Sequence, residues 1–264
     1  MKQHSVKRNR VVGTFMSSPV IAVGPDTSFV DAVQMMILKG IGNLAVVDGE
    51  RVFGIITERE LLHHFVFNKT LPNKKVRYLL TQRFTKVTPE TSILEAAKTM
   101  IAKRTRLLVF QKDKLTGSDH LVGIITASDI VRAFLRTVKN PTIESAMANK
   151  IYTVRPDSTI LAAAKMMLKK GIGSVVVTQN GSPYGIFTER DLLNRVLAEH
   201  VDIEEKVGAF STSPVVSSKL GIRARTAGRI MLSRKIKRLP LTKGGSVVAM
   251  VTARDLVEAF QRGK

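Results

Sequence analysis

Residues 185–191 read GIFTERD, and similar heptapeptides occupy 54–60 (GIITERE), 123–129 (GIITASD) and 249–255 (AMVTARD). Successive threonines of this phrase stand 62 to 69 residues apart. A phrase that recurs at nearly constant spacing is typical of a chain built from repeated structural units. The sequence therefore predicts four repeats, which are marked by Thr57, Thr126, Thr188 and Thr252.

A second phrase precedes each heptapeptide by about thirty residues. It reads VGPDTS at 23–28, VTPETS at 87–92 and VRPDST at 154–159, and it has degenerated to SSKLGI at 217–222. Repeats one and three align without a gap, whereas repeats two and four share the phrases TASDIVRAF and TARDLVEAF. This alternation indicates that a two-repeat unit was duplicated.

Each repeat has the pattern of one β-α-β-β-α unit. In repeat one a short apolar strand at 20–23 precedes a helix whose apolar residues recur at helical spacing, namely Val30, Val33, Met36 and Ile37. Gly40 and Gly42 end this helix. Strands at 43–47 and 52–56 follow, and a second helix opens at Thr57.

Such a unit leaves one face of its three-stranded sheet open, and a neighbouring repeat is the obvious cover. The expected fold class is therefore α+β, with four repeats paired face to face into two modules that form a flat disc. The modules span 12–138 and 142–262, and pairing of modules occurs within one chain or in a homodimer. The expected repeats are residues 12–67, 78–138, 142–200 and 207–262.

Composition narrows the classes of function. The chain has 264 residues, no cysteine and no tryptophan, which excludes disulfides, thiol nucleophiles and thiolate metal sites. No apolar run reaches the length of a membrane span, and no secretory leader is visible, so we expect a soluble, cytoplasmic protein without a membrane partner. Lys and Arg number 42 against 21 Asp and Glu, a formal net charge of +21.

These repeated phrases resemble the CBS domain, the small regulatory repeat named after cystathionine beta-synthase. The resemblance covers nearly the whole chain, and four copies are similar to the gamma subunit of AMP-activated kinase and to stand-alone archaeal proteins. In the family, paired repeats form Bateman modules whose clefts bind AMP, ADP, ATP or S-adenosylmethionine. The resemblance thus implies a regulatory sensor of adenine nucleotides that is not an enzyme and requires no cofactor.

The heptapeptide offers a chemical reason for nucleotide binding. Its threonine stands where a strand ends and a helix begins, and helix N-termini attract phosphate. The acid three residues later is suited to ribose hydroxyls and the intervening arginine to phosphate. The expected ribose and phosphate ligands are Thr57, Glu60, Thr126, Asp129, Thr188, Arg190, Asp191, Thr252, Arg254 and Asp255. The same T-x-x-D/E spacing is also a helix capping box, which we expect in all four repeats.

Other aligned positions carry further expectations. Basic residues before the middle strand of the even repeats are suited to ligand phosphates, or alternatively to solvent: Arg106, Lys237 and Arg238. By resemblance, four aligned first-strand residues hold the adenine ring, although core packing would also explain them: Val20, Phe84, Ile151 and Val215. Glu60 replaces the aspartate of the other repeats, which makes a ribose contact in the first repeat doubtful.

The surplus of positive charge supports a second reading. Residues 209–264 hold twelve Lys or Arg and two acids, and smaller clusters include Lys2, Lys7, Arg8, Lys69, Lys74, Lys75 and Arg77. A nucleic acid, bound through its phosphates, or an acidic protein would match this charge, and solubility alone is the simpler explanation. No arrangement of residues predicts a catalytic group or a metal site.

Overall fold

The computed structural model describes residues 10–68, 73–81 and 84–262, and each repeat there forms one three-stranded sheet. Lys2, Lys7, Arg8 and Lys69 of the predicted basic clusters lie outside the described residues. Repeat one contains η1 (Val12–Thr14), β1 (Ala22–Val23), α2 (Phe29–Lys39), β2 (Asn43–Asp48), β3 (Arg51–Thr57) and α3 (Glu58–Asn68). Repeat two contains η2 (Val76–Tyr78), β4 (Phe84–Val87), α4 (Ile93–Lys103), β5 (Arg106–Lys112), β6 (Asp119–Ile125) and α5 (Ala127–Phe134).

The second half of the chain repeats this order. Repeat three contains β7 (Thr153–Val154), α6 (Ile160–Lys170), β8 (Ser174–Gln179), β9 (Ser182–Thr188), α7 (Glu189–Asp191) and the π-helical η3 (Leu192–Leu197). Repeat four contains α8 (Val207–Phe210), β10 (Ser218–Lys219), α9 (Ala224–Ser233), β11 (Arg238–Lys243), β12 (Ser246–Thr252) and α10 (Ala253–Arg262). The first strand of repeat one is shorter than the sequence suggested, because only Ala22 and Val23 pair with β2.

Local chemistry sets the helix boundaries. The side chain of Ser28 accepts the amide of Asp31 at the start of α2, and Ser92 and Thr159 cap α4 and α6 in the same way. Gly40, with φ of 62°, ends α2 in the left-handed conformation that glycine adopts without strain. In every sheet the first strand is parallel to the second and the second is antiparallel to the third.

The sheets face each other in pairs. Ile55 of repeat one packs with Leu108, Phe110 and Ile124 of repeat two in one buried cluster. A second cluster joins repeats three and four through Val176, Ile186 and Met250. The face-to-face pairing predicted from the open sheet faces is therefore confirmed, and both modules lie within one chain.

A leading segment precedes the first strand of every repeat and crosses onto the partner repeat. The four leading segments are residues 12–19, 76–81, 143–150 and 207–213. Each forms a bridge with the third strand of its partner, at Ser17–Ile124, Thr81–Ile55, Ala148–Met250 and Thr212–Ile186. The glycine of the repeated phrase has its physical reason here, since a Cβ on Gly54 would collide with the carbonyl oxygen of Thr81.

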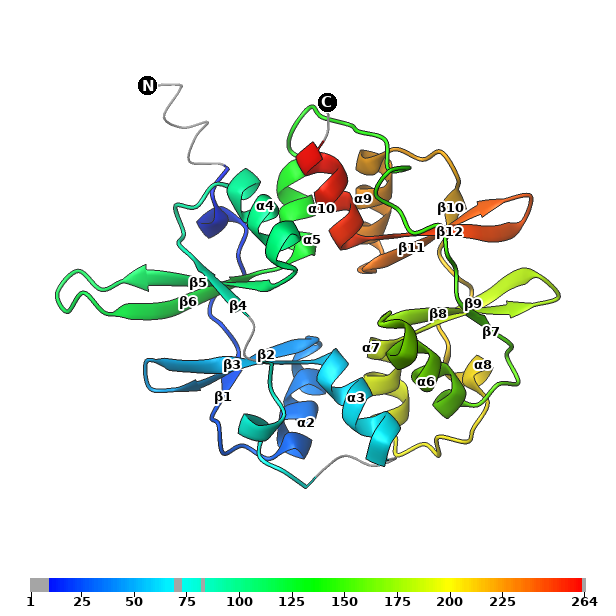
Figure 1. The fold of residues 1–264 in the computed structure, drawn as a ribbon, viewed down its shortest axis with the longest axis horizontal. Coiled ribbons are helices and arrows are strands. Elements are labelled where there is room, and N and C mark those ends of the chain that lie inside the picture. Colours follow the sequence, from blue (N-terminus) through cyan, green and yellow to red (C-terminus); the bar gives the residue numbers. More distant parts are fainter. Residues whose placement is uncertain (1–9, 69–72, 82–83, 263–264) are drawn as a thin grey trace.

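The helices join the two modules. Helices α4, α5, α9 and α10 of repeats two and four share one core, in which Phe134 and Phe260 stack with ring centroids 5.2 Å apart. Helix α3 of repeat one packs against α6 and α7 of repeat three. Figure 1 shows the result as a ring of four units, with sheets stacked on the left and right and helices meeting above and below the centre. None of the helices in the described ranges is long and apolar enough to span a bilayer.

Candidate functional site

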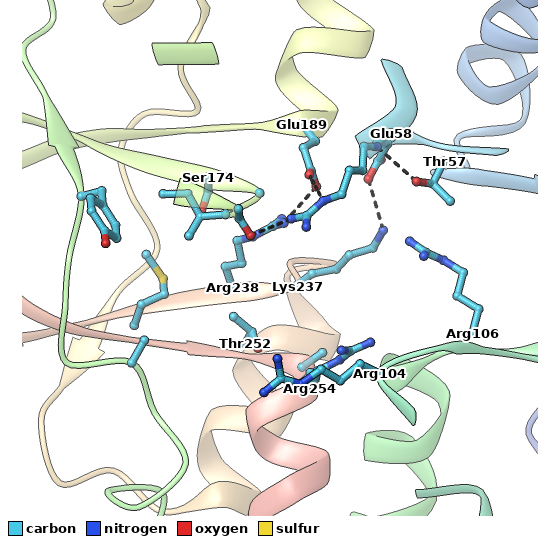
Figure 2. Close-up of a pocket in the computed structure, with 18 of the residues that line it drawn as sticks. Thr57, Glu58, Arg104, Arg106, Ser174, Glu189, Lys237, Arg238, Thr252 and Arg254 are labelled. Atoms are coloured by element: carbon cyan, nitrogen blue, oxygen red, sulfur yellow. Dashed lines mark hydrogen bonds and ion pairs between the residues drawn. The ribbon is translucent and has the colours of Figure 1, made fainter. Parts of the chain in front are cut away.

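A cavity of about 600 Å³ lies where all four repeats meet. Repeat one lines it with residues 57–60, repeat two with Arg104, Thr105 and Arg106, and repeat three with Glu189 and residues 171–174. Repeat four adds further cations and Thr252, and the leading segment of repeat three adds Ala148 and Lys150. Its lining includes Thr57 of repeat one and Thr252 of repeat four, two of the repeated threonines (Figure 2).

Positive charge dominates the wall of this cavity. Of the described residues that line it, seven are cationic and three are carboxylates. The cations are Arg59, Arg104, Arg106, Lys150, Lys237, Arg238 and Arg254. Figure 2 shows the side chains of the even repeats gathered around one space. The three phosphate ligands expected before the middle strands, Arg106, Lys237 and Arg238, therefore lie together.

The ends of helices and strands place these cations around the cavity. Arg104 ends α4 in the left-handed conformation, with φ of 47°. Arg106 and Arg238 are the first residues of β5 and β11, and Arg254 lies in the first turn of α10. Within the described part of the chain, Arg104, Arg106 and Arg254 form no ion pair. Their charge is available to an anion.

Burial is the main cause that lowers the pKa of three of these cations, and neighbouring positive charges add to it. Burial lowers the pKa of Arg106, and Arg59 lowers it further, while Glu60, Glu189 and Glu58 oppose the shift. Burial also lowers the pKa of Lys237, an effect that Glu58 opposes and the neighbouring arginines reinforce. The pKa of Arg254 is lowered by burial and then by Arg106 and Arg104. An anion in the cavity would favour the charged forms.

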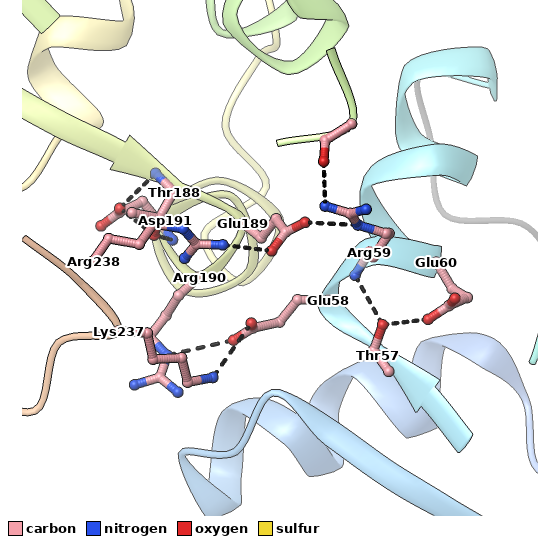
Figure 3. Close-up of polar contacts among 11 residues, drawn as sticks. Thr57, Glu58, Arg59, Glu60, Thr188, Glu189, Arg190, Asp191, Lys237 and Arg238 are labelled. Carbon is pink, nitrogen blue, oxygen red and sulfur yellow. Dashed lines mark hydrogen bonds and ion pairs between the residues drawn. The ribbon is translucent and has the colours of Figure 1, made fainter. Parts of the chain in front are cut away.

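Two buried glutamates hold the odd repeats together in a crossed arrangement (Figure 3). Arg59 of repeat one lies 3.4 Å from Glu189 of repeat three, and Arg190 of repeat three lies 3.4 Å from Glu58 of repeat one. Arg59 also donates to the carbonyl of Gly171 at 3.0 Å. The Glu-Arg pairs of TERE and TERD thus form two reciprocal ion pairs across the contact between α3 and α7.

The same glutamates reach cations of repeat four. Arg238 Nη2 donates to Glu189 Oε2 at 3.2 Å, and Lys237 Nζ lies 3.8 Å from Glu58 Oε2. The Glu58 and Glu189 side chains are only 10% and 9% exposed, so each depends on its cations for compensation. Gly42 and Gly173 make room for them, because a Cβ at either position would collide with a carboxylate.

The acids of the repeated phrase are not equivalent. Asp129 accepts the amide and hydroxyl of Thr126 and pairs with Arg132 at 3.0 Å. Asp191 accepts the amide and hydroxyl of Thr188, and its other oxygen accepts from Thr212 at 3.0 Å. These two acids are buried and do not line the cavity. The expected capping boxes are confirmed at both positions.

Asp255 and Glu60 differ from these two acids. Within the described residues Asp255 hydrogen-bonds only Thr252, whose amide donates at 2.8 Å, so its carboxylate retains acceptor capacity. Burial raises the pKa of Asp255. Glu60 lines the cavity but accepts the hydroxyl of Thr57, and the amide bonded to that hydroxyl is the one on Arg59. Repeat one therefore has a modified cap.

Between repeats three and four the cavity has an apolar wall, here called the apolar cleft, which is formed by the segment that leads into β7 and by β12. The wall residues are Ala148, Ile151, Tyr152 and Met250. Of the four residues expected to hold adenine, Ile151 lines the cavity, whereas Phe84 and Val215 pack between sheets and Val20 is half-buried elsewhere. Thr126, Thr188, Arg190 and Asp255 also lie outside the cavity lining.

Several lining residues were not identified from the sequence. Arg59, Glu58 and Glu189 belong to the repeated phrase, and the alternation of Glu in odd repeats with Ala127 and Ala253 in even repeats was the available signal. Arg104 and Lys150 gave no comparable signal because each precedes a strand in a loop. No cluster of three or more metal-ligating side chains occurs among the residues described.

Two face-to-face pairs of β-α-β-β-α units around a shared central cavity define a tandem repeat protein. A family model for the CBS domain matches residues 12–66, 76–136, 143–198 and 207–262, and the chain belongs to this family. A protein of the ribosomal RNA operon of Thermofilum pendens is 31% identical over 180 residues, 63% of this chain. Protein MJ1404 of Methanocaldococcus jannaschii is 27% identical over 95% of this chain. The chain spans 58% and 62% of the lengths of these two relatives.

Solved structures share the whole fold. Protein MJ1225 of Methanocaldococcus jannaschii, which has been proposed as an archaeal homologue of g-AMPK, superposes with a TM-score of 0.79 at 20% identity. The match covers 95% of this chain and 99% of that protein. A conserved protein of Pyrococcus horikoshii gives a TM-score of 0.66 at 21% identity, again over 95% of this chain. At these identities the likeness shows the fold alone.

Proposed function

We propose that this chain is a regulatory, non-enzymatic sensor that binds AMP, ADP or ATP with its phosphates in the central cavity. The observation that carries the proposal is the continuity between a cation-lined centre and an adjoining apolar cleft. Three arginines without ion pairs among the described residues, Arg104, Arg106 and Arg254, are suited to phosphate oxygens because their planar guanidinium groups donate in pairs.

The nucleoside end belongs in the cleft between repeats three and four. There the apolar wall of Ile151, Tyr152 and Met250 suits a flat base. Asp255 does not itself line the cavity, but it follows the lining residue Arg254 and has acceptor capacity left for the ribose hydroxyls. The N-terminus of α10 adds the positive end of its helix dipole on the phosphate side. The proposed homology of MJ1225 to g-AMPK supports the adenine nucleotide among other choices.

A sensor needs a ligand that interacts differently with two states of the protein. The cavity is lined by all four repeats, so a bound nucleotide would contact both modules at once. Binding would therefore bias the relative placement of the modules, and the altered outer surface is what a partner would recognise.

Isothermal titration of nucleic-acid-free protein with AMP, ADP, ATP, GTP and S-adenosylmethionine tests this function. We expect saturable binding of adenine nucleotides and none of the sulfonium compound, because the lining is cationic. Asp255→Ala should weaken every nucleotide about tenfold, as expected for the loss of charge-assisted hydrogen bonds. Heat from none of the five would overturn the proposal, and equal affinity for GTP would overturn its choice of adenine.

A second candidate function is binding of nucleic acid through its phosphates. It is favoured by the charge that the cavity does not account for, since seven lining cations are a small part of the 42 in the chain. Retention on an RNA column should then fall steeply with salt, because each neutralised phosphate releases counterions. Failure to bind RNA or DNA at about 50 mM salt would exclude it.

A further inference from the structure

The two buried glutamates occupy cations that the phosphates of a nucleotide would otherwise use. Glu189 bonds Arg238 and Glu58 lies beside Lys237, and both of these cations line the cavity. We infer that Glu58 and Glu189 are specificity-determining residues that compete with the ligand's phosphates and set the site's preference among AMP, ADP and ATP. This inference rests on the proposed function.

Each glutamate contacts two cations, so it can release one of them and keep the other. Glu189 lies between Arg59 of repeat one and Arg238 of repeat four, and Glu58 lies between Arg190 and Lys237. A buried carboxylate stripped of every cation would be strongly destabilised. Because Arg59 and Arg190 remain after exchange, a phosphate can take Arg238 and Lys237 while both carboxylates stay compensated.

Five of the seven cations that line the described cavity fall into two sets. Arg104, Arg106 and Arg254 form no ion pair within the described residues and are open to the first phosphate. Lys237 and Arg238 are already engaged by carboxylates, so the phosphates of a longer chain must compete with those carboxylates for them. The glutamates consequently oppose the additional phosphates of ADP and ATP more than the single phosphate of AMP.

The difference in sequence between odd and even repeats supports this inference. The odd repeats place Glu58 and Glu189 after their threonines, whereas the even repeats have Ala127 and Ala253 there. Only the odd repeats also carry Gly42 or Gly173, the positions at which a side chain would collide with the glutamate. The competing carboxylates and the space for them thus occur together.

The test is titration of Glu58→Gln/Glu189→Gln with AMP, ADP and ATP beside the wild type. Glutamine keeps the size of glutamate and removes its charge. We expect ATP affinity to rise about tenfold, the effect of one charge-assisted contact regained, and AMP affinity to rise less than about threefold. The matched control is Glu90→Gln/Glu144→Gln, which makes the same change in net charge at exposed positions away from the cavity.

Three results would overturn the inference. They are equal gains for AMP and ATP, gains of the same size in the control, and a loss of affinity in the glutamine variant. Circular dichroism and thermal unfolding establish that the double variant folds, and the single variant Glu58→Gln, which retains the Arg59–Glu189 pair, replaces it if it does not. If the wild type binds ATP but the glutamine variants match the control, only this inference fails. If no form binds, the proposed function fails as well.

Discussion

The guanidinium of Arg238 and the carboxylate of Glu189 share a 3.2 Å hydrogen bond in the space that a side chain on Gly173 would fill. These residues come from repeats four and three, so this bond crosses the module that forms the apolar cleft. The missing side chain of Gly173 is what allows an arginine and a glutamate to meet beside the first residue of β8.

Gly173→Ala should separate this pair. The new methyl group would meet the far end of the Arg238 side chain, which can rotate away, so the free energy of unfolding should fall by only about 1 kcal/mol. ATP should bind more tightly because Arg238 is released from its carboxylate. The comparison variant is Gly54→Ala, whose methyl group meets the immobile carbonyl of Thr81 and should cost about 1–3 kcal/mol. Urea unfolding measures both, and a larger loss for Gly173→Ala would contradict this account.

Asp191→Ala should act on stability rather than on ligand binding. Its carboxylate accepts from Thr188 at 2.7 Å and from Thr212 at 3.0 Å, so the change removes a helix cap and a link to the leading segment of repeat four. We expect unfolding free energy to fall by about 1–3 kcal/mol. Asp255→Ala should lower the free energy of unfolding less than Asp191→Ala does, and it should weaken nucleotide binding more. The expectation is wrong if the two variants show the reverse order in chemical unfolding and titration.

Nucleotide affinity should depend on pH through Lys237. Its pKa is below 10.5 in the folded chain, chiefly through burial, and a bound phosphate would favour the ammonium form. Binding then takes up a proton, and affinity falls as pH rises through the lowered pKa. The folding stability of the ligand-free chain depends on pH in the opposite direction. Between the lowered pKa and the ordinary pKa of Lys237 the unfolded state binds more protons than the folded state, so the contribution of Lys237 to stability rises with pH.

Lys237→Arg tests this assignment. A guanidinium stays protonated across the window, so the alkaline loss of affinity should disappear while binding at neutral pH is retained. Titration calorimetry in buffers of different ionisation enthalpy reports the proton uptake directly. A pH profile that is identical in the variant would assign the effect to another group.

Magnesium should weaken ATP binding and leave AMP binding nearly unchanged. Seven cations line the described cavity, and a divalent ion on the phosphates neutralises the charge that they recognise. The measurement is the ATP dissociation constant with and without magnesium chloride, with potassium chloride added to match the ionic strength. Tighter binding of the magnesium complex would show that the phosphates do not face this lining.

Much of the fold could be predicted from the sequence because its signals are local and repeated. The recurrence of Thr57, Thr126, Thr188 and Thr252 gave the repeats, and the open sheet face gave their pairing. The crossed leading segments could not be predicted, since they consist of backbone bonds between residues far apart along the chain, such as Ser17 and Ile124 or Ala148 and Met250. Nothing in the local pattern of either segment identifies the other as its partner.

Part of the site could be predicted because some of its residues occupy aligned positions of the repeats. Alignment identified Arg106, Lys237 and Arg238, but it treated Asp129, Asp191 and Asp255 alike. Their side-chain contacts distinguish them. Asp129 pairs with Arg132 and Asp191 accepts from Thr212, whereas Asp255 hydrogen-bonds only Thr252 among the described residues. The pairing of Glu58 with Arg190 likewise depends on how α3 meets α7, which a single repeat does not encode.

The crossed leading segments also set an order for folding during synthesis. The amide of Ser17 donates to the carbonyl of Ile124 at 2.9 Å, so the first segment lacks this partner until most of the second repeat has left the ribosome. Contacts between residues so distant along the chain form slowly. The nascent first repeat therefore exposes a sheet face and an unfilled strand edge for longer than a self-contained domain would, which makes it a natural substrate for chaperones that shield such surfaces.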